Sequence, residues 1–118
     1  MIITTPELQK LINAKNKDYV LIDVRRHDEL HNGMIPTAVH LPLYELEEVF
    51  ALDEKTFKKK YNFKKPDKKK LIILYCRTGG RSYTATSLLS QKGFRAVNYA
   101  GSIWEWSEID SSVKKYFH

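Results

Sequence analysis

The fold of this chain is indicated most clearly by residues 71–82, which read Leu71-Ile72-Ile73-Leu74-Tyr75-Cys76-Arg77-Thr78-Gly79-Gly80-Arg81-Ser82. The first five residues are apolar and rich in β-branched and aromatic side chains, which is typical of a central parallel strand covered on both faces. Apolar residues then recur at helical spacing, and Gly93 suits the end of a helix. The sequence therefore predicts a strand, a short loop from Cys76, and a helix that begins at Arg81 or Ser82.

The segments on either side alternate between helix and strand patterns. Thr4 or Thr5 is expected to cap a first helix that carries Pro6 in its first turn. The other expected strands are 19–24, 38–41 and 96–99, and the other expected helices are 28–32, 44–50, 53–60 and 103–117, the last as one helix or two. Such alternation predicts an α/β fold, with a mainly parallel central sheet and helices on both faces. We expect residues 1–118 to form one domain, because a chain of 118 residues buries only one modest core.

Gly79 and Gly80 give the loop after Cys76 the character of an anion-binding cradle. Adjacent glycines allow a tight turn whose N–H groups point inward, and the N-terminus of the next helix adds partial positive charge. The same field, with Arg77 and Arg81 as further cations, lowers the pKa of a thiol placed there. The alternative is that Cys76 is a small buried hydrophobe, but core packing requires neither a glycine turn nor flanking guanidinium groups. The sequence thus predicts Cys76 as a nucleophile, in a substrate-binding loop made of Arg77, Thr78, Gly79, Gly80, Arg81 and Ser82.

The size of this loop narrows the chemistry further. Cys76 and Arg81 enclose four residues, one fewer than the corresponding loop of cysteine-dependent phosphatases. The sequence here resembles the rhodanese family, whose loop reads Cys, Arg, any residue, Gly, any residue, Arg. Cys76, Arg77, Gly79 and Arg81 match that pattern. The resemblance implies sulfur transfer through a persulfide on the cysteine.

The two arginines of the motif are expected to act differently. Arg77 is better placed to meet a sulfonate at the rim of the cradle. Arg81, at the start of the helix, either faces the cradle or turns away and braces the loop through a carboxylate.

The resemblance covers residues 19–106. Its further matches are Leu21, Ile22, Asp23, Val24, Arg25, Glu29, Gly33, Ile35, Pro36, Ala38, Leu41, Pro42, Tyr99, Gly101, Ser102 and Trp106. Residues 50–67 look like the single-domain thiosulfate sulfurtransferases of eukaryotes, some of which use glutathione as acceptor. The resemblance therefore implies a rhodanese-like single domain without a cofactor. It also implies thiosulfate or a related persulfide as sulfur donor. The implied acceptor is a thiol such as glutathione, or cyanide, or a protein.

Three residues depart from the family pattern. Met34 stands where the family commonly has His, Thr37 where it often has Gly, and Ser102 where many members have a second Gly. We expect none of the three to touch the cradle, so that they bear on the subgroup and not on the chemistry of Cys76.

Two other functions remain open from the residues. The chain is either an enzyme or a non-catalytic module that carries a persulfide and binds another protein, and the intact Cys76 favours the enzyme. A phosphatase or an arsenate reductase is disfavoured, because the loop is short and the chain has one cysteine, so an intermediate on Cys76 has no second thiol to resolve it.

The positive charge of the chain is concentrated in one segment. Residues 58–70 hold eight lysines and one aspartate, a charge of +7, whereas the whole chain carries +6 and the remainder therefore −1. Tyr61 and Phe63 lie between these lysines, but without a recognisable nucleic-acid module the segment is weak support for RNA or DNA binding. Steering of small anions or a solvated surface accounts for it as well.

The remaining signals are weaker. Asp23 and Arg25 are expected to give structural support at the end of a strand. His27 and His31 stand four apart but have no third ligand nearby, so we expect no metal. No apolar run approaches the roughly 20 residues that span a bilayer, and the N-terminus has neither a secretory nor an Arg-rich transit pattern. We expect a cytoplasmic location, or a mitochondrial one if a targeting peptide has been removed.

Overall fold

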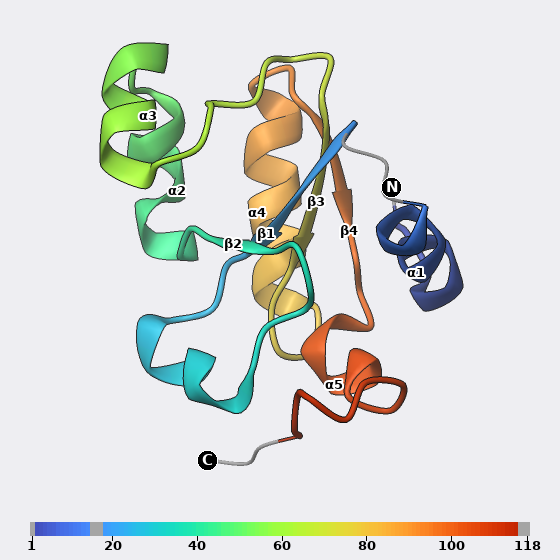
Figure 1. Ribbon diagram of the computed structural model, residues 1–118. Coiled ribbons are helices and arrows are strands. Elements are labelled where there is room, and N and C mark those ends of the chain that lie inside the picture. The colour runs from blue at the N-terminus through green and yellow to red at the C-terminus, as the bar shows by residue number, and fades with distance from the viewer. Residues whose placement is uncertain (1, 15–17, 116–118) are drawn as a thin grey trace.

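Four parallel strands form one sheet in the computed structural model, which describes residues 2–14 and 18–115. The strands are β1 (Tyr19–Asp23), β2 (Val39–His40), β3 (Leu71–Tyr75) and β4 (Arg95–Asn98). Their order across the sheet is β2-β1-β3-β4 (Figure 1). β3 pairs with β1 on one side and with β4 on the other. The predicted central parallel strand is therefore confirmed, and Cys76 directly follows it.

Helices cover both faces of this sheet. They are α1 (Thr5–Asn13), the 3₁₀ helix η1 (His27–Asn32), α2 (Leu43–Phe50), α3 (Glu54–Tyr61), α4 (Gly80–Gln91) and α5 (Ser102–Trp106). Side chains of a strand point alternately to its two faces. On β3, Ile72 and Leu74 pack with buried residues of α2, α3 and α4, whereas Ile73 and Tyr75 pack with those of α1 and α5. The predicted α/β architecture with two covered faces is thus confirmed (Figure 1).

Local capping explains where two of the predicted helices begin. Thr4 caps α1, in which its side chain accepts the Glu7 N–H while the Glu7 carboxylate accepts the Thr4 N–H. Asp53 caps α3 by accepting the Thr56 N–H at 2.7 Å. Helix α4 starts at Gly80, one residue before the earlier of the two predicted starts.

The prediction of one or two closing helices over 103–117 is wrong beyond residue 106. Helix α5 ends at Trp106, and turns and irregular backbone follow to residue 115. Asp110 accepts hydrogen bonds from Trp106 Nε1 and from the Ser112 N–H, both at 2.9 Å, and so holds the chain in a turn. Val113 is buried just beyond that turn, in the same cluster as residues of α1 and α5. Residues 116–118 of the prediction lie outside the described residues.

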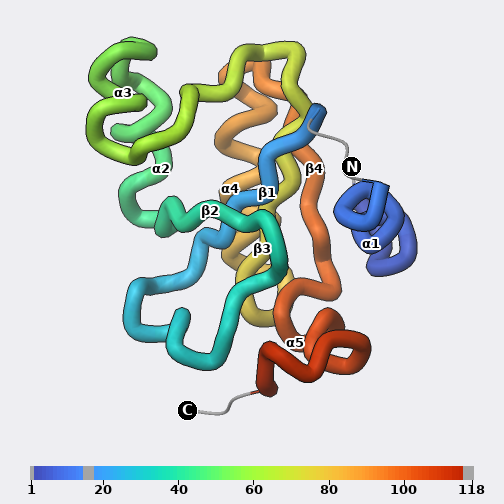
Figure 2. The backbone as a smooth tube through the Cα atoms, viewed as in Figure 1, coloured from blue at the N-terminus to red at the C-terminus, as the bar shows by residue number. Residues whose placement is uncertain are grey.

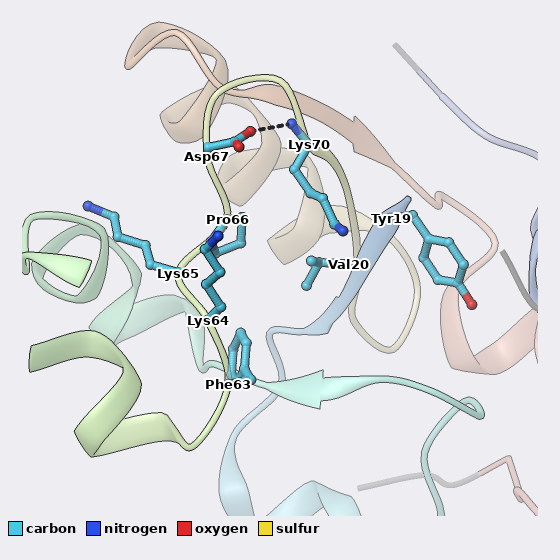
Figure 3. A pocket seen from close by; sticks show the side chains of 8 residues that line it. All are labelled: Tyr19, Val20, Phe63, Lys64, Lys65, Pro66, Asp67 and Lys70. Carbon is cyan, nitrogen blue, oxygen red and sulfur yellow. Dashed lines mark hydrogen bonds between the residues drawn. The ribbon is translucent and has the colours of Figure 1, made fainter. Parts of the chain in front are cut away.

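The lysine-rich segment 58–70 lies at the amino ends of the strands. It runs from α3 to the start of β3, whereas Cys76 follows the carboxyl end of β3. A pocket of about 260 Å³ opens there, lined in part by Phe63, Lys64 and Lys70 (Figure 3). Asp67 accepts the Lys70 N–H at 3.0 Å and so closes the turn before β3. The basic segment and the cysteine are therefore at opposite ends of the sheet.

Residues near both ends of the described chain are tied to the central part of the fold. The Ile3 N–H donates to the Asn98 carbonyl at the end of β4 at 3.0 Å, and the Lys114 N–H donates to the Asn32 carbonyl at the end of η1 at 3.0 Å. In the backbone trace, the segment after α5 accordingly passes beside η1 (Figure 2).

Candidate active site

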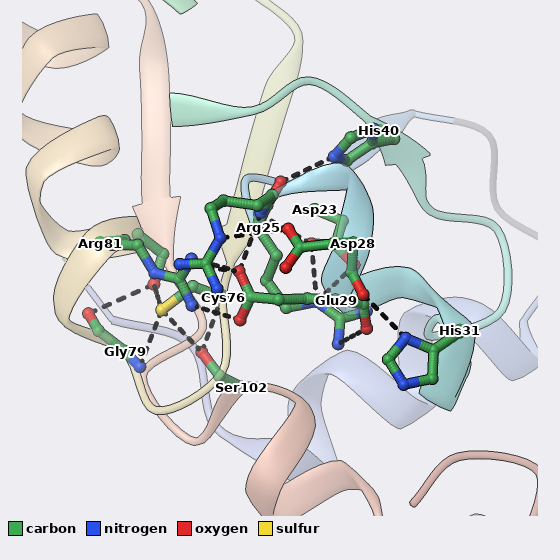
Figure 4. Close-up of polar contacts among 12 residues, drawn as sticks. Asp23, Arg25, Asp28, Glu29, His31, His40, Cys76, Gly79, Arg81 and Ser102 are labelled. Atoms are coloured by element: carbon green, nitrogen blue, oxygen red, sulfur yellow. Dashed lines mark hydrogen bonds and ion pairs between the residues drawn. The ribbon is translucent and has the colours of Figure 1, made fainter. Parts of the chain in front are cut away.

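The Cys76 thiol lies at the base of the loop between β3 and α4. The residue is 1% exposed, and its Sγ accepts the Gly79 N–H at 3.0 Å (Figure 4). The hydroxyl oxygens of Ser82 and Ser102 lie 3.6 and 4.0 Å from the same sulfur. The sulfur is thus surrounded by polar groups at the carboxyl end of the sheet, which is where ligands bind in open α/β folds.

One of the two loop glycines is required by the backbone. Gly79 has a φ of +103°, and a Cβ added there would lie 2.5 Å from the Ala100 carbonyl oxygen. Gly80 has nothing within 4 Å of such a Cβ and is the first residue of α4. The tight turn predicted for both glycines therefore depends on Gly79, which directs its own N–H at Cys76.

The hydrogen bonds around the sulfur favour the thiolate. Burial raises the pKa of Cys76, but the Ser82 hydroxyl and the backbone N–H groups of Ser82, Gly79 and Thr78 lower it, and the net pKa lies below the ordinary value. A larger fraction of the thiol is therefore ionised near neutral pH than in an unfolded chain, and the thiolate is the nucleophilic form.

The Arg81 side chain is committed to a carboxylate. Its guanidinium forms a bidentate ion pair with Glu29, with N–O distances of 2.5 and 2.8 Å. Glu29 is 2% exposed and also accepts the Arg26 N–H at 2.9 Å. This pair ties the first turn of α4 to η1, so of the two roles expected for Arg81 the structure shows the bracing one.

A second, fully buried ion pair lies behind the first. Arg25 and Asp23 are both 0% exposed and are joined at 2.7 Å. Arg25 also donates to the carbonyl oxygens of Glu29 at 3.3 Å and Gly33 at 2.8 Å. The expected structural role of Asp23 and Arg25 is confirmed, because these contacts hold η1 against the end of β1.

The Arg77 side chain lies against an aromatic ring. Its guanidinium carbon is 5.4 Å from the centre of the Trp104 indole, and Lys115 Nζ is 5.0 Å from the same centre. The backbone N–H of Trp104 donates to the Arg77 carbonyl at 3.0 Å, so α5 fixes this part of the loop. Thr78 is exposed beside Arg77. Two cations and one indole thus flank the cradle.

The expectation that Ser102 stays away from the cradle is wrong. Its hydroxyl accepts the Cys76 N–H at 3.1 Å and donates to the Tyr99 carbonyl at 2.9 Å. Ser102 also has a φ of +55°, a region that favours glycine. A serine where the family often has glycine was the available signal, because such a residue needs a compensating contact.

Thr37, the other residue in place of a glycine, likewise has a φ of +74°. Its hydroxyl lies 3.1 Å from the Tyr19 hydroxyl at the start of β1. This contact is at the end of β1 opposite to the cradle, which agrees with the expectation for Thr37.

Asn98 contacts Ser82 of the cradle, which the sequence did not reveal. This residue at the end of β4 is 4% exposed, and its Oδ1 accepts the Ser82 hydroxyl at 2.6 Å. Asparagine is common in loops and at strand ends, so the residue type alone gives no indication of a contact across 16 residues of sequence.

The two histidines that were considered as ligands make other contacts. His31 lies 2.7 Å from the Asp28 carbonyl, and the ring centre of His27 lies 6.1 Å from that of His40. Within residues 2–14 and 18–115, no three His, Cys, Asp or Glu side chains are grouped as metal ligands. In the same part of the chain, no helix has the length and apolar character needed to cross a membrane.

Comparison with known proteins links this geometry to a family. Residues 4–109 match the model of the rhodanese-like domain. The human thiosulfate:glutathione sulfurtransferase is 33% identical over 111 residues, which are 92% of this chain and 95% of that protein. A mitochondrial relative from Schizosaccharomyces pombe, named as a putative thiosulfate sulfurtransferase, is 43% identical over 94 residues, which are 79% of this chain and 66% of the relative.

Solved structures agree with these matches. The human single-domain sulfurtransferase TSTD1 superposes with a TM-score of 0.86 at 32% identity, over 92% of this chain and 96% of that one. The single-domain sulfurtransferase RDL2 of Saccharomyces cerevisiae superposes with a TM-score of 0.83 at 32% identity, over 96% of this chain and 94% of that one. Together these relatives support sulfurtransferase activity.

Proposed function

This chain belongs to the rhodanese-like domain family and has that family's fold, and we propose that it transfers the outer sulfur of thiosulfate to a small thiol through a persulfide on Cys76. The observation that carries the proposal is the Gly79 N–H, which points at Cys76 Sγ from 3.0 Å within a loop that favours the thiolate. A preorganised N–H group is suited to the negative charge of a thiolate and of a terminal persulfide sulfur.

The reaction we propose has two displacements. The Cys76 thiolate attacks the outer sulfur of thiosulfate, the sulfur–sulfur bond of thiosulfate breaks, and sulfite leaves with the electron pair. An acceptor thiolate then attacks the outer sulfur of the Cys76 persulfide, and Cys76 leaves as a thiolate. Each step conserves charge, and neither requires a redox partner or a cofactor.

The cradle residues have different roles in this proposal. The N–H groups of Thr78, Gly79 and Ser82 stabilise the sulfur anion, since each lowers the pKa of Cys76. Arg77, at the rim beside Trp104, meets the sulfonate of thiosulfate. Arg81 holds the loop in place through Glu29 and does not contact the donor. Gly80 begins α4, and a side chain at this position would meet nothing within 4 Å.

Glutathione is the acceptor that we propose, because two relatives at 33% and 31% identity are named thiosulfate:glutathione sulfurtransferases. We place the reaction in the cytoplasm or the mitochondrial matrix, where thiols stay reduced. Two relatives are named as mitochondrial.

The direct test is the intact mass of the protein after thiosulfate treatment and again after addition of glutathione. The wild type should gain one sulfur atom and then lose it, and Cys76→Ser should gain none. A wild type that gains no sulfur overturns the proposal. A persulfide that forms but passes only to a protein and to no small thiol favours a persulfide-carrier module instead.

The proposed role of Arg77 has a separate test. Replacing Arg77 by Ala should raise KM for thiosulfate roughly tenfold, because a charge-assisted contact to the sulfonate is lost. KM for an uncharged persulfide donor should change much less. Arg95→Ala is the matched control, since Arg95 is exposed at the amino end of β4. Equal increases in KM for both donors would contradict the assignment.

A further inference from the structure

The Ser82 hydroxyl has more acceptors around it than it can serve. It carries one proton, and three acceptors lie near its oxygen: Asn98 Oδ1 at 2.6 Å, the Gly79 carbonyl at 3.2 Å and Cys76 Sγ at 3.6 Å. Ser82 is 0% exposed and Asn98 is 4% exposed, so these buried groups compete directly. The shortest contact is to the amide and not to the sulfur.

The orientation of the Asn98 amide follows from its other neighbour. Its Nδ2 lies 3.4 Å from the Gly79 carbonyl oxygen, which can only accept a hydrogen bond. The opposite orientation would place Oδ1 against that carbonyl, with two acceptors facing each other. Asn98 therefore presents an acceptor to Ser82, and the Ser82 proton is directed mainly at the amide.

We propose that Asn98 is a positioning residue for Cys76, because it limits the share of the Ser82 hydroxyl proton that reaches the sulfur. The inference concerns the thiol of the function proposed above and rests on Cys76 being its reacting group. Removing the Asn98 amide leaves the Gly79 carbonyl at 3.2 Å and Cys76 Sγ at 3.6 Å as the acceptors of the Ser82 proton, so a larger share of that proton reaches the sulfur. A stronger hydrogen bond to the anionic sulfur stabilises the thiolate and lowers the pKa of the thiol.

This arrangement affects the two displacements in opposite directions. At a pH where Cys76 is fully ionised, a thiolate of higher pKa is the better nucleophile toward thiosulfate, whereas a thiol of lower pKa is the better leaving group when the persulfide is discharged. Asn98 thus favours the first displacement at the expense of the second. The expected size is roughly threefold in each rate constant for a change of 1 in pKa.

The charged groups around the cradle stay the same when Ser82 or Asn98 is replaced by alanine. One of these groups is Arg77 on the loop. The others, drawn in Figure 4, are Arg81 of α4 with Glu29 of η1 and the Asp23–Arg25 pair at the end of β1. A change in the pKa of Cys76 in the alanine variants therefore reports the neutral hydrogen bonds.

The test is the pH dependence of thiolate absorbance and of iodoacetamide alkylation in four proteins: wild type, Ser82→Ala, Asn98→Ala and the double variant. Asn98→Ala should lower the pKa of Cys76 by about 1. Ser82→Ala should raise that pKa by less than about 1, because in the wild type only a minor share of the Ser82 proton reaches the sulfur. The double variant should match Ser82→Ala, since Asn98 acts only through the Ser82 proton. A higher or unchanged pKa in Asn98→Ala, or an Asn98 effect that persists without Ser82, overturns the inference.

Two further variants guard against loss of folding. Asn98→Leu keeps the size of the side chain without its polar atoms, so it should lower the pKa of Cys76 as Asn98→Ala does. Thr86→Val is the control, because Thr86 donates to the Ser82 carbonyl at 2.8 Å in the same helix, and it should leave the pKa unchanged. Alkylation titrates the thiol whether or not sulfur is transferred, so failure of the proposed function and failure of this inference are distinguishable.

Discussion

Ser102 shows how one residue can hold the backbone of Cys76. Its left-handed φ of +55° is unfavourable for a side chain with a Cβ, yet its hydroxyl gives the buried Cys76 N–H an acceptor at 3.1 Å. A glycine there would remove the strain and also remove the acceptor. The serine therefore has a strained backbone, but its hydroxyl fixes the position of Cys76.

Substitutions of Ser102 should separate these two effects. Ser102→Ala keeps the strain and leaves the Cys76 N–H without its acceptor, so the free energy of unfolding should fall by about 1–3 kcal/mol. Ser102→Gly relieves the strain, and its loss should be smaller by about 1 kcal/mol. Urea unfolding of both variants measures the difference. An alanine variant as stable as the glycine variant would show that the strain is absent.

Residue chemistry was predictable where neighbours in sequence supply it. The loop motif around Cys76 indicated Gly79 as a turn glycine, although it wrongly gave Gly80 the same role, and it offered bracing as one role for Arg81. The contacts of Ser82 with Asn98 and of Cys76 with Ser102 span 16 and 26 residues. Hydroxyl and amide side chains suit many surroundings, so only the folded sheet reveals which of them reach the sulfur.

At the scale of elements, the join between β3 and α4 depends on one glycine. Gly79→Ala should distort the loop and lower the free energy of unfolding by more than about 1 kcal/mol, because φ is +103° and the Ala100 carbonyl blocks a Cβ. Persulfide formation should fall with it. Gly80→Ala should be neutral or stabilising by about 0.4–1 kcal/mol, since its position in the first turn of α4 is open. Thermal unfolding and single-turnover mass analysis test both, and similar losses in the two variants would contradict the distinction.

Element boundaries were predictable where a cap or a stop is local. The Asp53 cap was predicted correctly, and of the two caps expected for α1 the structure shows Thr4; each acts on an N–H three residues away. The end of α5 at Trp106 was missed, because its stop is a hydrogen bond from the Trp106 indole to Asp110 in place of a glycine or proline.

At the scale of the molecule, the basic segment 58–70 should have little influence on thiosulfate. It lies at the amino ends of the strands, and a five-residue strand at about 3.3 Å per residue puts it more than one Debye length from the cradle. Joint replacement of Lys58, Lys59 and Lys64 by Gln should change kcat/KM for thiosulfate by less than roughly twofold. Arg77→Gln serves as the comparison. A large, salt-dependent loss in the lysine variant would instead support steering by this segment.

Stability at high pH should reflect buried phenols. Burial raises the pKa of Tyr99 to about 12, while the Thr5 hydroxyl lowers it and the carboxylates of Glu105 and Glu108 raise it. An unfolded tyrosine titrates near about 10. The contribution of Tyr99 is therefore complete below a pH of about 10 and is lost as the pH rises through about 12, because only the unfolded chain releases the proton at first.

The pH dependence of the unfolding free energy checks this expectation. Tyr99→Phe should show a shallower decline between about pH 10 and 12 than the wild type. Thr5 keeps its 2.7 Å hydrogen bond to Glu105 in that variant. Tyr83→Phe is the control, since Tyr83 is 66% exposed. Parallel curves for wild type and Tyr99→Phe would rule out the buried phenol as the cause.

The architecture as a whole was the most predictable feature. Strand and helix patterns, together with the loop motif, indicated the parallel sheet and the family, and both are confirmed. The partner of Arg81 needed the folded chain, because Glu29 lies 52 residues away in sequence and the sheet alone brings η1 to the start of α4.

The ties of Ile3 to Asn98 and of Lys114 to Asn32 have a practical consequence for anyone who labels this protein. Asn98 also contacts the Ser82 hydroxyl beside Cys76, and Asn32 ends the helix η1 that braces the loop. A fluorophore or surface linker attached beside Ile3 or Lys114 would disturb the very loop under observation. A label attached within residues 62–70, at the opposite end of the sheet, should leave the loop around Cys76 undisturbed.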